Sequence, residues 1–510
     1  MSYLLLAFAA LTAAAAQAAD PAATSLLHQA LAAQGGEARL RAVGALRWTA
    51  VGYRNMLEQS ERPEGPYIVE YQTLSEIHDQ KGGRLRSVTD SAIYPVARYS
   101  SGYVTDGTAA MRLAGEVRRP GSPEMITLSR ETLALSPERL LLTALDSADA
   151  HLEAAAVLQS TPQDVIGFSL DGAPVRIYLN RYTHLPTAMD YAGPLARSGY
   201  WRFLGDVTMR TSYGFWWIAK GGIRLPMQWD VARNGLPDAS YSIRELSLDT
   251  PVPETDLAIA PEIRTAFAAQ PAPVGLGDMP FGTPRQPAVD LAPGIVLVPG
   301  SWNVTFVRQD DGVVIIEAPI SSGYTAKSIA EARRRFPGVP IKAVITTSDS
   351  WPHVAGIREY VAQGIAIYHL DINAPILKRV IGAPYTSRPD ALERSGRARP
   401  AILKPVSGAT AFGSGPNRMM IYPIRGETSE RQLMVYFPEH RLLYGSDPFQ
   451  RGADGSLSFP QAVTELADAA AREGLNPDRF FMMHIGPTPW ADLTKAVAEA
   501  GARDTPDGKY

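Results

Sequence analysis

Residues 344–364, VITTSDSWPHVAGIREYVAQG, decide the fold of the second half of this chain. Residues 344–347 form a short apolar run rich in β-branched side chains, which predicts a buried strand. Residues 356–361 place apolar side chains at helical spacing, which predicts a helix. Between them lies a polar loop, and loops held by rigid elements are where binding and catalytic groups concentrate.

The composition sets the outer bounds. A chain of 510 residues predicts two or three domains. Hydrophobic residues make up 45% and charged residues 20%, as in ordinary globular proteins. The net charge of -3 gives no electrostatic basis for a nucleic-acid partner or an anionic membrane. The chain has no cysteine, which excludes disulfides, thiolate metal sites and cysteine nucleophiles.

The first residues have the pattern of a secretory signal. Residues 4–16 are an apolar, alanine-rich run, and Ala16-Gln17-Ala18 is a small-x-small cleavage site. The preceding residues lack Lys and Arg, which departs from the usual signal. We predict a signal peptide over residues 1–18 and a periplasmic or secreted mature protein. No later stretch of the mature chain is apolar enough to predict a membrane span.

A proline-rich segment divides the mature chain. Residues 268–293 contain six prolines, Pro271, Pro273, Pro280, Pro284, Pro287 and Pro293, a density that predicts a linker without regular structure. The sequence therefore predicts a β-rich domain over 19–267, a linker over 268–293 and a second domain over 294–505.

The first domain has the pattern of an antiparallel sheet. A helix is predicted over residues 25–43, broken at Gly35-Gly36, and another over 137–145 with Ser136 as its N-cap. Strand-like runs separated by glycine turns are predicted at 46–53, 67–77, 84–87, 165–170, 175–179, 187–191, 205–213, 215–219 and 227–231. The pattern resembles the curved sheet of lipoprotein-carrier-like domains found in exported bacterial proteins.

Few groups in this domain predict chemistry. Scattered histidines such as these predict surface positions or hydrogen-bonded core positions: His28, His78, His151 and His184. The run Phe215-Trp216-Trp217 alternates on a strand, which favours core and edge packing. An apolar groove for a lipid-like ligand is the alternative.

The second domain resembles the metallo-β-lactamase fold. Strands are predicted at 292–298, 303–307, 312–319 and 341–347, and a helix at 328–336. The last strand leads into the quoted loop, where residues 347–353 align with the T-H-x-H-x-D-H motif of that family. The resemblance implies an αββα sandwich with its site on the loops at one edge. With the β-rich first domain, the predicted fold class is α+β.

The resemblance also implies which metal ligands are missing. The two histidines of H-x-H correspond to Ser348 and Ser350, and a third falls at Glu427 or Thr428. Serine hydroxyls are poor zinc ligands at neutral pH, because zinc sites use His, Cys and carboxylate groups. We therefore expect the first zinc site of the family, and with it the dinuclear centre, to be lost.

A second site would retain part of its ligand set. Its aspartate corresponds to Pro352, but its other ligands correspond to His353, Asp447 and His484. Two histidines and one carboxylate are a plausible set for one divalent ion. The resemblance thus implies at most one zinc or other divalent metal. In the alternative, the three residues hold no metal and stabilise turns and loops.

Two classes of function follow. The resemblance implies metal-dependent hydrolysis of an ester, thioester, amide or phosphoester. The lost ligands favour the alternative, a metal-free binding or scaffolding protein for a small-molecule or lipid-like ligand. No residue is assigned as catalytic, although Ser350 with His353 is the one local nucleophile–base pair. Asp349 and Glu427 are additional carboxylates that could replace ligands or repel each other.

Overall fold

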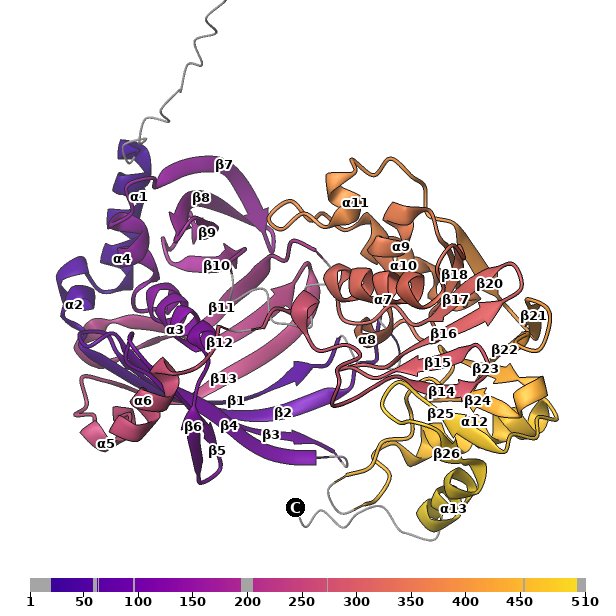
Figure 1. Ribbon diagram of the computed structural model, residues 1–510. Coiled ribbons are helices and arrows are strands. Elements are labelled where there is room, and N and C mark those ends of the chain that lie inside the picture. Colours follow the sequence, from indigo (N-terminus) through magenta and orange to yellow (C-terminus); the bar gives the residue numbers. More distant parts are fainter. Residues whose placement is uncertain are drawn as a thin grey trace, which may run out of the picture.

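The computed structural model describes residues 20–57, 62, 64–94, 97–193, 205–272, 274–452 and 455–501. The predicted signal peptide at 1–18 lies outside these residues. Figure 1 shows two bodies side by side, the first built around a large antiparallel sheet and the second from two sheets and their helices. In the described part of the chain, no helix combines the length and apolarity that a membrane crossing requires.

The first body is built on a 13-stranded sheet. Its spatial order is β6-β5-β4-β3-β2-β1-β13-β12-β11-β10-β9-β8-β7, so the first and last strands in sequence pair at its centre. The strands are β1 Ala45–Asn55, β2 Val69–Asp79, β3 Arg84–Ile93, β4 Ala97–Thr105, β5 Ala110–Ala114, β6 Val117–Pro120, β7 His151–Leu158, β8 Thr161–Leu170, β9 Ala173–Asn180, β10 Pro186–Tyr191, β11 Met209–Ile218, β12 Arg224–Arg233 and β13 Leu236–Leu248.

Short helices pack against this sheet. They are α1 Pro21–Gln34, α2 Glu37–Ala42, α3 Pro123–Leu135, α4 Leu140–Leu145, α5 Glu254–Leu257 and α6 Pro261–Ala268. Helix α1 begins where the Asp20 side chain accepts from the Ala22 amide, and it ends at Gly35, whose φ of 133° favours glycine. Apolar side chains of α1 and α4 are buried in one cluster with those of β8, which fixes the helices on the sheet.

Two predictions in this body are wrong in detail. The predicted helix at 137–145 begins only at Leu140, and Ser136 ends an unpredicted helix, α3, where its hydroxyl donates to the Leu133 carbonyl. The run at 215–217 does not pack in the core, because Phe215 is 73% and Trp217 61% exposed. The β11–β12 register is unshifted across this run, so Phe215 and Trp217 both lie on the exposed face of the strand and alternate with the half-buried Trp216.

The proline-rich segment is more regular than predicted. Helix α6 ends at Ala268, a 3₁₀ turn spans Leu276–Asp278, and strand β14 (Val289–Ala292) pairs with β15. Phe281 packs edge-on against Tyr324 at 5.3 Å, which holds the segment on the second body. The prediction that 268–293 has no regular element is therefore wrong at β14.

The second body contains two sheets. The first has the order β14-β15-β16-β17-β18-β19-β20 and the second β21-β22-β23-β24-β25-β26. Their further strands are β15 Ile295–Val298, β16 Val304–Gln309, β17 Gly312–Ile316, β18 Ile341–Ile345, β19 Ala366–Leu370, β20 Leu403–Val406, β21 Thr410–Phe412, β22 Met419–Pro423, β23 Leu433–Phe437, β24 Leu442–Tyr444, β25 Arg479–Phe481 and β26 Thr488–Pro489.

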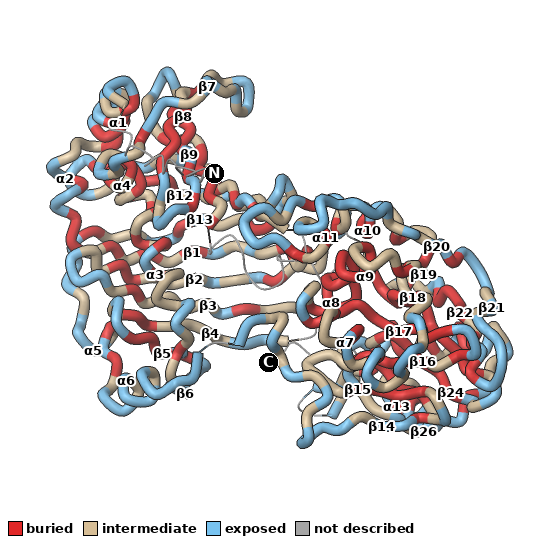
Figure 2. The backbone as a smooth tube through the Cα atoms, turned by 45° about the horizontal axis from the view of Figure 1, so that its top comes forward, coloured by how far each residue is buried: buried red, intermediate tan, exposed pale blue. Residues whose placement is uncertain are grey.

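The two sheets bury apolar side chains against each other. Val314 and Ile345 of the first sheet share a buried cluster with Val435 and Phe481 of the second. Helices lie on the outer faces, α7 and α9 against the first sheet and α12 and α13 against the second. Figure 2 shows the buried backbone concentrated in these layers. The helices are α7 Ser322–Arg335, α8 Trp351–Val354, α9 Ile357–Gln363, α10 Ala374–Gly382, α11 Ala391–Arg394, α12 Pro460–Arg472 and α13 Trp490–Gly501.

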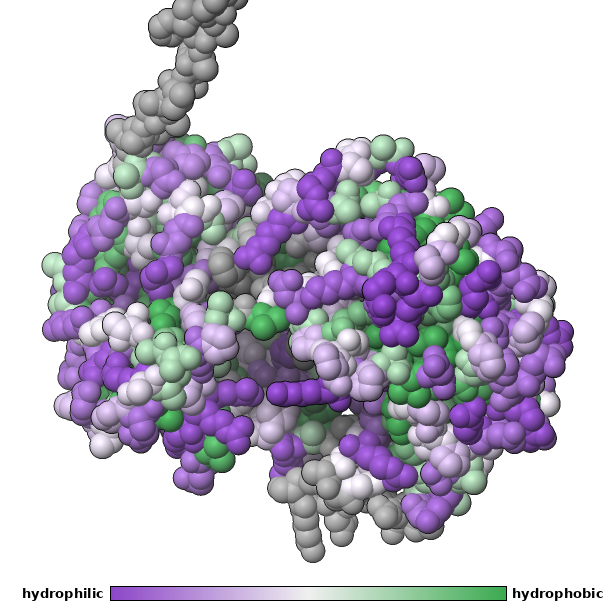
Figure 3. Space-filling model, in the orientation of Figure 1, coloured by the Kyte–Doolittle hydropathy of each residue, from purple (hydrophilic) through white to green (hydrophobic). Residues whose placement is uncertain are grey.

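Polar contacts join the two bodies, whose facing sides are hollowed in Figure 3. The Asp206 carboxylate accepts from the backbone amides and hydroxyls of Thr386 and Ser387 at 2.5–3.1 Å. The Arg62 guanidinium donates to both oxygens of Glu430 at 2.8 and 3.1 Å. The loop that carries Arg62 thereby reaches the rim of the pocket described next.

Candidate functional site

The candidate site lies where four strands of the second body end. Strands β17 and β18 are parallel neighbours, and so are β24 and β25, so the loops that follow them meet at one edge. The Thr347 carbonyl accepts from the Leu433 amide at 2.8 Å, and the Thr347 hydroxyl oxygen accepts from the Ser446 hydroxyl at 2.9 Å. These bonds join the loops of the two sheets.

The short helix α8 carries His353 into this edge. The helix starts after Ser350, with Pro352 in its first turn, and Trp351, Pro352, His353 and Val354 are all buried. Below it the chain turns at Glu317, whose φ of 85° is unusual for a residue with a side chain. The Ala318 amide donates to the His353 carbonyl at 3.0 Å, so this turn and α8 are fixed to each other.

His353 lies between two carboxylates. Its Nδ1 is 2.9 Å from Oε2 of Glu317, and its Nε2 is 3.4 Å from Oδ2 of Asp447. Burial disfavours the charged imidazole, yet the two carboxylates outweigh it and raise the pKa of His353 to about 10. At neutral pH this side chain is an imidazolium in two ion pairs.

Glu317 is held by hydroxyl groups on its other side. The Tyr444 hydroxyl donates to Oε1 at 2.9 Å, and the Thr347 hydroxyl donates to the same oxygen. Burial, and then the negative charge of Glu317, raises the pKa of Tyr444 far above its usual value, so the phenol remains a donor. Both of these donors reach Oε1, whereas Oε2 has no hydrogen-bond donor among the described residues and lies within ion-pair distance of His353.

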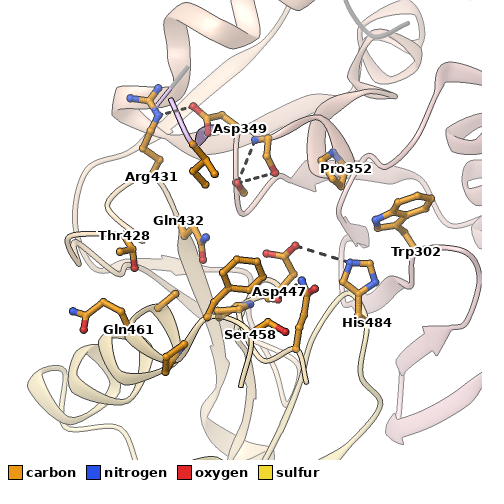
Figure 4. A pocket seen from close by; sticks show the side chains of 18 residues that line it. Trp302, Asp349, Pro352, Thr428, Arg431, Gln432, Asp447, Ser458, Gln461 and His484 are labelled. Atoms are coloured by element: carbon orange, nitrogen blue, oxygen red, sulfur yellow. Dashed lines mark hydrogen bonds and ion pairs between the residues drawn. The ribbon is translucent and has the colours of Figure 1, made fainter. Parts of the chain in front are cut away.

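Asp447 is the member of this cluster that faces solvent. Its side chain is 21% exposed, and its Oδ2 also lies 4.0 Å from Nε2 of His484. Burial alone would raise the pKa of Asp447, but the charge of His353 more than offsets it, and the net shift is downward. Burial lowers the pKa of His484, which keeps its ring neutral at pH 7. Figure 4 shows Asp447 and His484 pointing toward each other.

A cavity of about 420 Å³ opens above Asp447. One wall is the loop after β18, where the Ser348 hydroxyl accepts from the Ser350 amide at 3.2 Å. Asp349 lies in the same loop and accepts from Nε of Arg431 at 2.6 Å. Burial raises the pKa of Asp349, and the guanidinium opposes this shift. The remaining lining residues are Ile68, Trp302, Pro352, Thr428, Gln432, Pro448, Gln450, Ser458, Phe459, Pro460, Gln461, Ala462 and His484.

The structure brings the three predicted metal residues together without arranging them as ligands. His353, Asp447 and His484 are in contact, but a metal-bound imidazole must offer an unprotonated ring nitrogen. Both nitrogens of His353 face carboxylates instead. Among the described residues, no group of three or more His, Cys, Asp or Glu side chains is placed to hold a metal ion. The residues present therefore do not fit a zinc centre.

The other residues that the sequence suggested as ligands or catalytic groups lie apart from one another. Glu427 is exposed and does not line the cavity, whereas Asp349 is buried against Arg431, so the two carboxylates do not share a pocket. Thr428 lines the cavity and donates through its amide and hydroxyl to Glu465 of α12. Ser350 lacks a base in His353, since both ring nitrogens of His353 are engaged.

The sequence analysis missed Glu317 and Arg431 as members of the site. The sequence contains a signal for Glu317, because this single carboxylate follows the apolar run Val313-Val314-Ile315-Ile316 of a buried strand. Buried carboxylates require a partner. The partnership of Arg431 with Asp349 joins residues 82 positions apart, and no local pattern marks it.

Comparisons with known proteins give structural matches only. No protein-family model matches the chain, and the search of characterised proteins gives no significant match. The chain is similar to DIM-1 metallo-β-lactamase (16% identity, TM-score 0.32, 42% of this chain and 97% of that chain). It is also similar to TMB-1 (17% identity, TM-score 0.31, 42% of this chain and 98% of that chain). A third similar structure is a metallo-β-lactamase from Erythrobacter litoralis (16% identity, TM-score 0.32, 42% of this chain and 96% of that chain).

Proposed function

We propose that this protein is a metal-independent binding protein for a small molecule, with its pocket in an αββα domain of metallo-β-lactamase type. The observation that carries the proposal is the position of His353, with one ring nitrogen 2.9 Å from Glu317 and the other 3.4 Å from Asp447. This imidazolium supplies the positive charge that two close carboxylates need.

The small number of possible metal ligands at the cavity supports a function without a metal ion. Without His353, only Asp447 and His484 of the proposed ligands face the cavity, and zinc sites use at least three protein ligands. Ser348, Ser350 and Pro352 stand where further ligands would be needed.

The cavity itself supports a binding role. Its volume of about 420 Å³ lies in the range of small-molecule sites. Its lining combines neutral hydrogen-bonding groups with Trp302 and Phe459, a mixture that orients a ligand and covers its apolar surface. Ile68 of the first body also lines it, which gives the β-rich domain a part in the same site.

Zinc titration of chelator-treated protein by calorimetry tests the proposal. The unmodified protein should bind no stoichiometric zinc, because only Asp447 and His484 of the three candidate ligands line the cavity and zinc sites use at least three protein ligands. A triple variant, Ser348→His, Ser350→His and Pro352→Asp, should gain zinc if the scaffold is intact, and it serves as the positive control. One tightly bound zinc that is lost on His353→Ala or His484→Ala would contradict the proposal and favour a mononuclear hydrolase.

The ligand itself can be sought by native mass spectrometry of the protein isolated from its producing cells. A co-purifying small molecule should be present in the unmodified protein and absent from Ser350→Trp, whose indole would fill the cavity. A molecule that is retained in both proteins would place the binding elsewhere.

A further inference from the structure

The charges around the cavity do not cancel. Glu317 and Asp447 flank one imidazolium, so two carboxylates share a single positive charge. Glu317 is the nearer partner, at 2.9 Å against 3.4 Å, and it also accepts from Tyr444 and Thr347. The cluster is therefore one positive charge short, and Asp447 is its carboxylate that lines the cavity.

The cavity has little to offer an anion. Arg431 is the one lysine or arginine among the described lining residues, and its Nε donates to Asp349 at 2.6 Å. Its terminal nitrogen donates to the Ile372 carbonyl at 3.0 Å. An anionic ligand would have to displace an existing ion pair.

The walls suit a cation with an apolar body. The Trp302 ring is held edge-on by the buried Trp351 at 5.3 Å, and its centroid lies 6.1 Å from that of His484. Phe459 lines the same cavity with 40% of its surface exposed. Aromatic faces attract ammonium groups, and they also cover apolar surface. The Ser348 and Ser350 hydroxyls can accept from a cation with several N–H donors.

We infer that the cavity binds an organic amine, with its ammonium group at the Asp447 carboxylate and an apolar or aromatic body against Trp302 and Phe459. This inference rests on the proposed binding function and names the chemical class of its ligand. The ammonium group completes the charge balance of the Glu317–His353–Asp447 cluster from the cavity side.

Three probes of similar shape and different charge test the inference: benzylamine, benzyl alcohol and benzoate. Binding to metal-free protein at pH 7 is measured by ligand-observed NMR titration. Benzylamine should bind at least about tenfold more tightly than benzyl alcohol, the ratio expected for one partly buried ion pair, and benzoate should bind most weakly. Asp447→Asn should remove the preference for the amine, whereas Asp492→Asn on the exposed face of α13 should keep it.

A second variant separates charge recognition from folding. Trp302→Leu should weaken all three probes to a similar degree and leave their order unchanged, because it removes an aromatic wall and no charge. Equal binding of the three probes, a preference for benzoate, or no binding of any probe would overturn the inference. Those outcomes are distinct from failure of the proposed function, which would appear as stoichiometric zinc in the unmodified protein.

Discussion

Each of the two bodies buries one imidazole between two carboxylates, but the surroundings of the two clusters differ. In the first body, His78 donates through Nδ1 to Glu138 and through Nε2 to Glu76, each at 2.9 Å. Both carboxylates have further donors, Gln80 for Glu138 and Ser87 for Glu76. In the second body, one of the two carboxylates of His353, Asp447, lines a cavity.

The difference separates a structural cluster from a functional one. A buried histidine with a strongly raised pKa occurs in both bodies, since the pKa values of His78 and His353 are each raised to about 10 by their carboxylates against the effect of burial. A perturbed pKa alone therefore does not identify a site. A functional site is indicated where, in addition, one member of the cluster is accessible from a cavity. Asp447 meets this condition.

The largest expected effect is on stability. His78→Ala should lower the free energy of unfolding by about 3–5 kcal/mol, because it leaves the fully buried Glu138 without its cation. His353→Ala should cost less, about 2–3 kcal/mol, because the Thr347 and Tyr444 hydroxyls still donate to the buried Glu317 and Asp447 can be hydrated from the cavity. Urea unfolding measures both values. The double variant His78→Ala with Glu138→Gln should recover part of the loss, and equal costs at the two sites would contradict the comparison.

The pH dependence of stability has a sign that follows from the pKa of His78. The pKa of His78 is raised from 6.5 to about 10 on folding, so the folded state binds the extra proton between these values. Its contribution is complete below pH 6.5 and is lost as the pH rises through about 10. The free energy of unfolding should therefore fall over this range. The variant His78→Leu with Glu138→Gln should show a shallower fall, and an unchanged slope would count against a charged His78.

Replacing a single carboxylate by its amide should also have a different effect on stability in the two clusters. Glu138→Gln removes a buried charge partner and should cost about 2 kcal/mol, whereas Asp447→Asn should cost about 1 kcal/mol because its side chain is partly hydrated. Thermal and urea unfolding of the two variants provide the comparison. A larger cost for Asp447→Asn would show that the cavity side is the more tightly constrained one.

The smallest effect concerns the contact between the bodies. Arg62→Ala removes the ion pair with Glu430, in which the side chains are 36% and 32% exposed, so solvent screening limits the cost to about 0–1 kcal/mol. Hydrogen exchange should accelerate at residues 426–430, beside the cavity, and remain unchanged in β2, which carries His78. A double-mutant cycle with Glu430→Ala isolates the pair. Faster exchange in β2 would show that the two clusters are coupled.

Local patterns predicted the elements better than the contacts. The strand predicted at 341–347 and the polar loop after it were readable from periodicity, although β18 ends two residues earlier than predicted, at Ile345. The alternation at residues 215–217 is present in β11, but alternation does not say which face is covered, and Phe215 and Trp217 lie on the exposed face.

The two imidazole clusters show how much of the site could be predicted from the sequence. Glu76 and His78 are two positions apart on one strand and so share a face, a proximity that the sequence contains. Glu138 is 60 positions from His78, and Asp447 reaches His353 only because β24 ends beside β18 across two sheets. Resemblance placed His353, Asp447 and His484 together, but it assigned them to a metal, since the carboxylate that pairs with Nδ1 of His353 lies outside the family motif.

The position of His353 between Glu317 and Asp447 also restricts how this protein can change during evolution. Loss of any one of the three would leave a buried charge without its counterpart, so single substitutions at these positions should be eliminated by selection. In an alignment of related chains, positions 317, 353 and 447 should therefore covary. Chains with a neutral residue at 353 should also have lost the acidic residue at 317.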